Sequence, residues 1–127
     1  MIKMIKEELL SYIKGGRKED FLKKVLSILP PSDDVSISLG KMGLYEYVID
    51  RNGFSLIQTA EDEYLPYLSS NEKRIEFRQI PKTLIDKMDY VNVLEQLKSI
   101  LEQFGGRDKK YSSLAKEVGE LIEALRH

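Results

Sequence analysis

The sequence predicts an α+β fold, in which a small antiparallel sheet of three to four strands is flanked in sequence by two αα-hairpins. Three observations lead to this fold class. Apolar residues recur every three to four positions toward both ends of the chain, which is the period of an amphipathic helix. Between these regions, apolar and polar residues alternate and β-branched and aromatic residues are frequent, which is typical of strands. Paired glycines interrupt each helical region where one apolar stripe ends and the next begins.

Composition limits the class of protein. A chain of 127 residues with 42% hydrophobic and 32% charged residues fits one domain, residues 1–127. The absence of cysteine excludes disulfides and thiolate chemistry, and the single histidine, His127, is the last residue. No apolar run approaches the roughly 18 residues that span a bilayer, and the acidic Glu7 and Glu8 are not typical of a signal peptide. We therefore expect a cytoplasmic protein with no membrane partner and no cofactor, and the lysine and glutamate content favours a thermophilic source.

The first helical hairpin is expected over residues 2–29. Two apolar stripes with helical spacing define its helices: Ile2, Ile5, Leu9 and Ile13, then Phe21, Leu22, Val25, Ile28 and Leu29. Pro30 and Pro31 cannot continue the second helix. Between the stripes, Gly15 is expected just past the end of the first helix, in the left-handed conformation with positive φ.

The sheet region is expected over residues 35–80. Four segments have the composition of strands: residues 35–40, 44–50, 54–60 and 73–80. The segment EDEYLPYLSS is expected to form a loop or a short helical turn before the fourth strand.

The Asn-Gly pair at residues 52–53 is the sharpest local signal in this region, because it is the favoured pair of a type I′ hairpin turn. This turn pairs Arg51 with Phe54. It also aligns Val48 with Ile57, as a small apolar island on an otherwise polar face of the sheet. A four-residue Asp-Arg-Asn-Gly turn with a bulge, which slips the register and mixes the faces, is the alternative.

The second helical hairpin is expected over residues 83–126. Two further stripes define it: Leu84, Met88, Val91, Leu94, Leu97, Leu101 and Phe104, then Tyr111, Leu114, Ala115, Val118, Leu121, Ile122 and Leu125. Thr83 with Asp86 resembles a capping box at the start of the first helix, and Asp108 is expected to cap the last helix. Gly105 is also expected to end a helix with positive φ.

Two nearly identical phrases occur in the chain, GGRKEDF at residues 15–21 and GGRDKKY at residues 105–111. A duplicated segment should also match upstream of the glycines, but there Ile13 aligns with Gln103. We therefore interpret the shared phrase as shared turn chemistry rather than as a repeat.

An anion site is the functional alternative for these turns, because a helix N-terminus offers free N–H groups. Residues 1–29 and 73–82 each have a net charge of +3, whereas residues 30–72 have −6. On an alternating fourth strand, Arg74 and Arg78 would face the same side. The basic residues that could contact nucleic acid are Lys14, Arg17, Lys18, Arg74, Arg78, Arg107, Lys109 and Lys110. Acidic neighbours dilute them, so we expect at most weak, non-specific binding.

The leading functional hypothesis is a non-catalytic protein-interaction protein, such as a small subunit or adaptor, that self-associates as a homodimer. Aromatic rings with polar tips are enriched at interfaces, and an exposed apolar strand pair favours symmetric association. The expected interface residues are Tyr45, Tyr47, Val48, Ile57, Tyr64 and Tyr67. The same tyrosines would fit equally well at the edge of the core.

A metal-dependent hydrolase is the third hypothesis. Acidic clusters at residues 33–34 and 61–63, and the pair of Asp50 and Glu76, are the carboxylates that could hold Mg²⁺ or Ca²⁺. Neither cluster follows an EF-hand pattern, and no serine has a histidine available as a base. We therefore expect no catalytic residues and no metal site.

Overall fold

The computed structural model describes residues 4–32, 34–59 and 70–126. In chain order its elements are α1 (Ile5–Lys14), α2 (Lys18–Ile28), β1 (Ile37–Met42), β2 (Tyr45–Asp50), β3 (Gly53–Thr59), β4 (Ser70–Ile75), the 3₁₀ helix η2 (Phe77–Gln79), α3 (Lys82–Asp86), α4 (Tyr90–Phe104) and α5 (Lys109–Arg126). The described residues thus form five α-helices and a four-stranded antiparallel sheet with strand order β1-β2-β3-β4. The predicted α+β fold class is confirmed.

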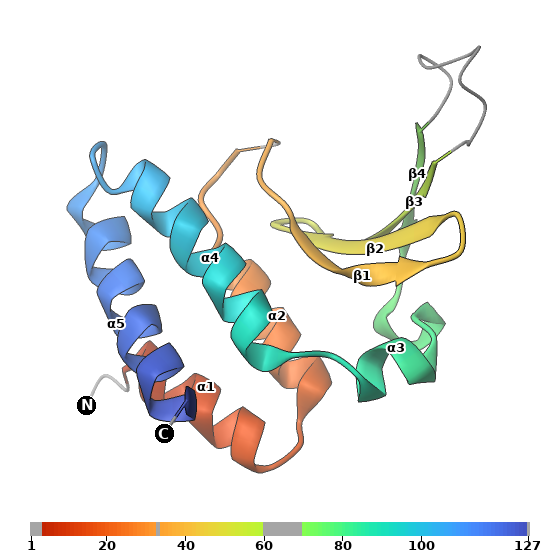
Figure 1. Ribbon diagram of the computed structural model, residues 1–127. Helices are drawn as coiled ribbons and strands as arrows, with labels where there is room; N and C mark the ends of the chain where they lie inside the picture. Colours follow the sequence, from red (N-terminus) through yellow and green to blue (C-terminus); the bar gives the residue numbers. More distant parts are fainter. Residues whose placement is uncertain (1–3, 33, 60–69, 127) are drawn as a thin grey trace.

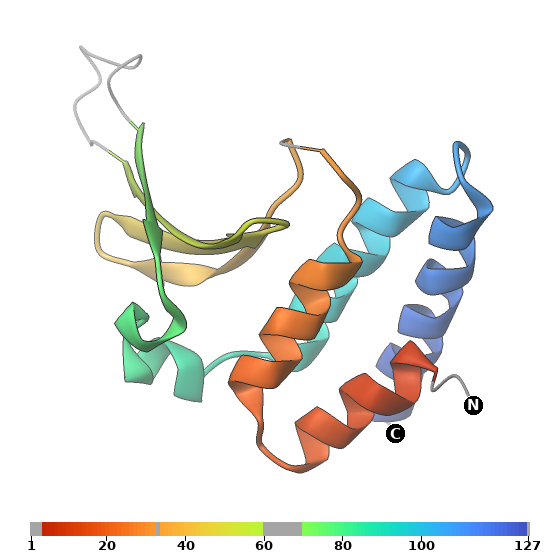
Figure 2. The ribbon, with the colours of Figure 1, turned by 180° about the vertical axis from the view of Figure 1, so that it is seen from behind.

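The helices and the sheet lie on different sides of the molecule. Figures 1 and 2 show α1, α2, α4 and α5 packed together on one side, the twisted sheet on the other, and α3 below the sheet. The start of α1 is attached to α5, because the Lys6 N–H donates to Glu117 Oε1 at 3.3 Å. In both views the α1–α2 turn and the α4–α5 turn lie at opposite ends of this helical layer.

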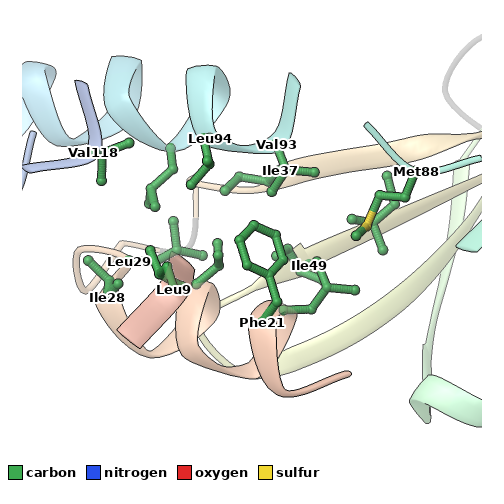
Figure 3. Packing of buried hydrophobic residues seen from close by; sticks show 14 of the residues in the cluster. Leu9, Phe21, Ile28, Leu29, Ile37, Ile49, Met88, Val93, Leu94 and Val118 are labelled. Atoms are coloured by element: carbon green, nitrogen blue, oxygen red, sulfur yellow. The ribbon is translucent and has the colours of Figure 1, made fainter. Parts of the chain in front are cut away.

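One hydrophobic cluster joins the helical layer to the sheet. The strand register aligns four buried residues in a row across the sheet: Ile37, Ile49, Phe54 and Ile75. Phe21 of α2 is fully buried and lies beside Ile49 (Figure 3). The Phe21 ring also meets the ring of Tyr90 edge to face, with centroids 4.9 Å apart. Burial raises the pKa of Tyr90.

The α1–α2 turn uses the second glycine of its pair. Gly15 is the C-cap residue of α1 with φ −86°, and Gly16 has the positive φ, at +68°. The Arg17 N–H donates to Tyr12 O at 2.9 Å and the Gly16 N–H donates to Ile13 O at 3.2 Å. These are the two hydrogen bonds of a Schellman motif, which requires the left-handed residue one position later than predicted.

The α4–α5 turn is built differently. Gly105 is the C-cap residue of α4 with φ −62°, and Gly106 has no positive φ either. Instead, the N–H groups of Arg107 and Asp108 both donate to Phe104 O, at 3.1 and 3.3 Å. The prediction of positive φ at the first glycine is therefore wrong in both turns, and the shared phrase does not specify one shared turn.

Alanine at position 16 is expected to lower the free energy of unfolding by about 1 kcal/mol, because a Cβ is strained in the left-handed conformation. Gly106→Ala is the matched control, since a Cβ at either glycine would have nothing within 4 Å and only Gly16 has positive φ. We expect the control to change the free energy by less than about 0.5 kcal/mol. Urea denaturation measures both variants, and equal losses would contradict the Schellman assignment.

The β2–β3 turn is centred one residue earlier than predicted. Asp50 pairs with Gly53, and Arg51 and Asn52 form the loop. The Asp50 side chain favours this turn, because its Oδ1 accepts from the Asn52 N–H at 2.8 Å and from the Arg74 guanidinium at 3.0 Å. The turn therefore spans the Asp-Arg-Asn-Gly residues of the alternative, but the ladder between β2 and β3 has no bulge, so the expected mixing of faces is wrong.

This register changes the cross-strand partners but not the faces. Val48 lies opposite Ser55, and the half-buried Ile57 lies opposite Glu46, so the predicted pairing of Val48 with Ile57 is wrong. The partners shift by two residues, and a shift of two returns each side chain to the same face of the sheet.

The fourth strand is shorter than predicted. It ends at Ile75 instead of continuing to residue 80. Glu76 and Gln79 form a capping box that starts η2, and the Glu76 N–H donates to Gln79 Oε1 at 2.8 Å. Arg74 and Arg78 therefore do not share one face of a strand, which corrects the prediction.

The helix predicted to begin at Thr83 divides into α3 and α4. Thr83 lies within α3 and makes no cap hydrogen bond, so the predicted capping box is wrong. Asp89 caps α4 instead, because its carboxylate accepts from the Val91 N–H at 2.9 Å. The predicted cap at Asp108 is present, with the Lys110 N–H donating to Asp108 Oδ1 at 3.0 Å.

Candidate functional site

The eight basic residues predicted as anion contacts do not form one surface. The α1–α2 turn and the α4–α5 turn, each with three of these cations in or beside it, lie at opposite ends of the helical layer (Figures 1 and 2). Arg74 lies in β4 and Arg78 in η2, outside both turns. A single phosphate-binding rim is therefore not assembled from the two turns.

Arg17 and Lys18, two of the three cations of the α1–α2 turn, have partners within the protein. Arg17 forms an ion pair with Asp20 at 2.7 Å, and its guanidinium lies over the Tyr12 ring, 5.0 Å from the centroid. The Lys18 ammonium donates to Ile85 O at 3.0 Å, at the end of α3. Binding of a phosphate by these side chains would have to break these contacts.

Two cations of the α4–α5 turn also have partners within the protein, and these partners are aromatic rings. The Arg107 guanidinium lies 5.6 Å from the centroid of the Phe104 ring, and the Lys110 ammonium lies 5.1 Å from that of Tyr111. Cations over aromatic faces are attracted by the ring quadrupole. Lys109 is exposed, and it forms no ion pair with the part of the chain that the structure describes.

A cleft of about 650 Å³ lies between α2, the β2–β3 turn and the segment from β4 to η2. Phe54, Ile75 and Phe77 supply its apolar surface, and the rings of Phe54 and Phe77 meet edge to face with centroids 5.8 Å apart. Arg74 and Arg78 also line it. The cleft therefore brings together two of the predicted cations, although not on one strand.

Ion pairs neutralise the cations of this cleft. The pairs are Lys23 with Glu19 at 2.9 Å, Arg74 with Asp50 at 3.0 Å, and Arg78 with Glu76 at 2.6 Å. The hydrogen bond to Glu19 raises the pKa of Lys23. A polyanion would have to displace three carboxylates here, so the cleft offers little free positive charge.

The predicted interface residues separate into buried and exposed side chains. Tyr47 and Val48 are buried, with 8% and 5% of their surface exposed, so neither can anchor a partner. Tyr45 is 41% exposed at the start of β2. Tyr64 and Tyr67 lie outside the described residues.

Large exposed hydrophobic side chains gather at the β1–β2 turn. Met42, Leu44 and Tyr45 expose 41%, 39% and 41% of their surface, and among the described residues only Met4 is another large hydrophobic residue exposed to this degree. Gly43 has φ +64° at the first loop position and the second has no positive φ, which is the pattern of a type II′ turn. We call Met42, Leu44 and Tyr45 the tip surface.

Of the tip surface, the sequence pattern predicts only Tyr45 as an interface residue, and not Met42 or Leu44. The missed signal is a glycine followed by one residue, Gly43 and Leu44, between two segments of strand composition, which favours a two-residue II′ hairpin. The predicted strands ended at residue 40 and began again at residue 44, with no turn predicted between them, so exposure at Met42 and Leu44 was not expected.

α3 packs beside the tip surface and completes a small groove. Gly40, next to a β-bulge in β1, has φ +135°, and a Cβ there would lie 2.8 Å from Leu84 Cδ1 of α3. Thr83 Oγ1 lies 3.9 Å from Met42 Sδ. The groove between β1 and α3 has a volume of about 150 Å³ and is lined by Lys41, Met42, Thr83, Leu84 and Lys87.

The carboxylates considered for metal binding are not gathered in the described part of the chain. No three aspartate, glutamate or histidine side chains within the described ranges could hold one ion together. Asp50 is bound by Arg74, and Glu76 belongs to the capping box of η2. Asp33 and residues 61–63 lie outside the described residues.

Comparison with models of known families, with curated proteins and with solved structures finds no match. No helix within the described residues is both long enough and apolar enough to cross a membrane. The function is therefore inferred from the surfaces of this chain alone.

Proposed function

We propose that this protein is a non-catalytic protein-interaction domain, an adaptor or small subunit, that docks a partner protein on the tip surface. The observation that carries the proposal is the exposure of Met42, Leu44 and Tyr45 within four consecutive residues. Single exposed apolar side chains are ordinary on a protein surface, whereas these three stand together in one turn. Methionine and tyrosine are also among the residues enriched at interfaces.

The size of the tip surface favours a short, transient contact. A large side chain presents about 200 Å², so three side chains that are about two fifths exposed present about 250 Å² together. A stable interface buries about 800 Å² on each partner. The tip surface therefore suits a short segment of another protein, and a stable homodimer would need a larger surface than this one.

Nucleic-acid binding, the second candidate, has weaker support. Six of the eight predicted contact residues have partners within the described residues: Arg17, Lys18, Arg74, Arg78, Arg107 and Lys110. The two basic turns lie at opposite ends of the helical layer and cannot contact the same few phosphates. Few neutralised phosphates imply a shallow salt dependence and weak binding.

Photo-crosslinking tests the proposal in cells that naturally make this protein. A photoreactive phenylalanine analogue in place of Leu44 is expected to crosslink one partner protein. The same analogue in place of Ser113, an exposed residue of α5, is expected not to crosslink it. The partner is then purified, and Tyr45→Ser is expected to weaken its affinity about tenfold or more. Equal crosslinking at both positions, or unchanged affinity for Tyr45→Ser, would contradict docking at the tip.

A further inference from the structure

We infer that the docked segment is acidic and places one apolar side chain in the groove between β1 and α3. This inference rests on the proposed function and names the chemistry of the partner. It follows from the charges that line the groove, from the volume of the groove, and from the way in which α4 covers the edge of β1.

The groove carries two lysines that form no ion pair with a described residue. Lys41 and Lys87 line it, and no carboxylate of the described part of the chain does. Both lysines are exposed. Glu46 lies opposite Lys41 on β2, but its carboxylate accepts from Ser38 Oγ at 2.8 Å. Asp86 is exposed on α3 and does not line the groove.

The lysines of the groove differ from the cations of the larger cleft in having no carboxylate partner among the described residues, so a partner protein can use their charge. Each cation of the cleft already has a carboxylate within 3.0 Å, whereas the two lysines of the groove have none within the described residues. Complementary charge at the rim of an interface selects the partner and speeds encounter. A segment with aspartate or glutamate is therefore the complement of this groove.

The volume of the groove sets the size of the apolar anchor. About 150 Å³ is the size of a cavity that holds a benzene ring. Met42 and Leu84 supply apolar walls, and Tyr45 stands exposed at the turn beside them. One phenylalanine or leucine of the partner therefore fills the groove.

The edge of β1 limits where the segment can bind. The Gln96 side chain of α4 accepts from the Ser38 N–H and donates to Ser38 O, both at 2.9 Å. This side chain occupies the edge of β1 in the place of a neighbouring strand. A partner therefore cannot pair with β1 along its whole length and binds beyond Ser38, where Lys41 and Met42 lie.

A second copy of this chain and a lipid surface fit the groove less well. A two-fold contact between tips would bring Lys41 and Lys87 against their own copies, with like charges opposed. An anionic lipid surface gains about 1 kcal/mol per lysine, which is little for two lysines, and a flat surface does not fill a concave groove. Both remain outcomes of the test.

Titration of ¹⁵N-labelled protein with three synthetic peptides tests the inference by NMR. The peptides share one phenylalanine and differ in their flanking residues, which are glutamate, glutamine or lysine. The acidic peptide is expected to shift the amide signals of residues 41–45 and 83–87, with an affinity about fivefold higher than that of the glutamine peptide. This preference should shrink when the salt rises from about 50 to about 300 mM.

Two double variants that remove the same charge show which lysines cause the preference for the acidic peptide. Lys41→Gln with Lys87→Gln is expected to remove the fivefold preference for the acidic peptide. Lys14→Gln with Lys109→Gln removes the same charge from two other exposed lysines that form no ion pair with a described residue, and is expected to keep the preference. The amide spectra also report whether each variant is folded.

Four results would overturn the inference. The first is that the glutamine peptide binds at the tip as tightly as the acidic peptide, and the second is that the acidic peptide shifts signals elsewhere. The third is that the tip signals shift with protein concentration alone, without peptide. The fourth is that the protein binds anionic vesicles and not the peptides, and that Leu44→Ser abolishes the vesicle binding. Equal binding of the glutamine peptide leaves the proposed function intact, because the tip still docks a segment. The crosslinking experiment tests the proposed function separately, because equal crosslinking at positions 44 and 113 would contradict docking at the tip.

Discussion

Replacing Phe21 by alanine is expected to lower the free energy of unfolding by about 4 kcal/mol. Phe21 is fully buried where α2 meets the sheet, beside Ile49 and against Tyr90 (Figure 3). The substitution removes this burial and leaves a cavity between the two layers. Phe77→Ala is the control, because Phe77 is only half-buried in the cleft and is expected to cost less than half as much. Urea denaturation gives both values, and equal costs would mean that Phe21 does not hold the layers together.

Tyr90 supplies a second readout of the same substitution. Burial raises its pKa from the usual 10.0. The stability that comes from its neutral phenol is therefore fully present below the unfolded pKa of about 10, and is lost as the pH rises through the higher folded pKa. Phe21→Ala opens the phenol to water, so its ionisation, followed by tyrosinate absorbance, is expected to move to lower pH.

Replacing Gly40 by alanine is expected to lower the free energy of unfolding by about 2 kcal/mol. A side chain is strained at φ +135°, in a region that only glycine adopts easily. The new Cβ would also lie 2.8 Å from Leu84 Cδ1, so Leu84, which lines the groove, must shift. Urea denaturation measures the loss, and NMR peptide titration measures the weakened binding at the tip.

A double-mutant cycle separates the two causes. Leu84→Ala removes the contact with the new Cβ but leaves the backbone strain at position 40. The pair of substitutions is therefore expected to cost less than the sum of the single ones. Additive costs would mean that Gly40 and Leu84 do not touch, and a wild-type stability of Gly40→Ala would contradict the backbone described beside the bulge.

Much of the fold could be predicted from local patterns. The period of apolar residues located α1, α2, α4 and α5, and Asp108 was recognised as a cap because capping needs only neighbours in sequence. The choice between Gly15 and Gly16 could not be predicted, because adjacent glycines both accept positive φ. Hydrogen bonds of the folded turn decide between them.

The turn of the central hairpin is held by a local contact of Asp50 with the Asn52 N–H and by a second contact with a distant residue. An Asn-Gly pair predicts a type I′ turn, but Asp50 accepts from Arg74, which lies 24 positions along the chain and reaches the turn only when β4 pairs with β3. A local pattern does not contain this contact. The sequence could therefore predict the hairpin but not its register.

The candidate site was predicted less well than the fold. Alternation placed Tyr47 and Val48 on opposite faces, yet both are buried, and alternation alone does not tell which faces of a sheet are covered. The partners of the basic side chains are tertiary contacts or cation–π contacts that composition does not reveal. Exposure at the tip follows from the β1–β2 turn, and that turn was not predicted.

The central claim is that a partner docks on the tip surface, and calorimetry tests it most directly. The measurement is the affinity of the crosslinked partner for the double variant Leu44→Ser with Tyr45→Ser, whose stability is measured first. Both side chains are exposed, so we predict a change in the free energy of unfolding below about 0.5 kcal/mol for each. Binding of the partner is predicted to weaken at least about thirtyfold, because the variant loses two of the three side chains of the tip surface. Unchanged affinity in a fully folded variant would contradict docking at the tip.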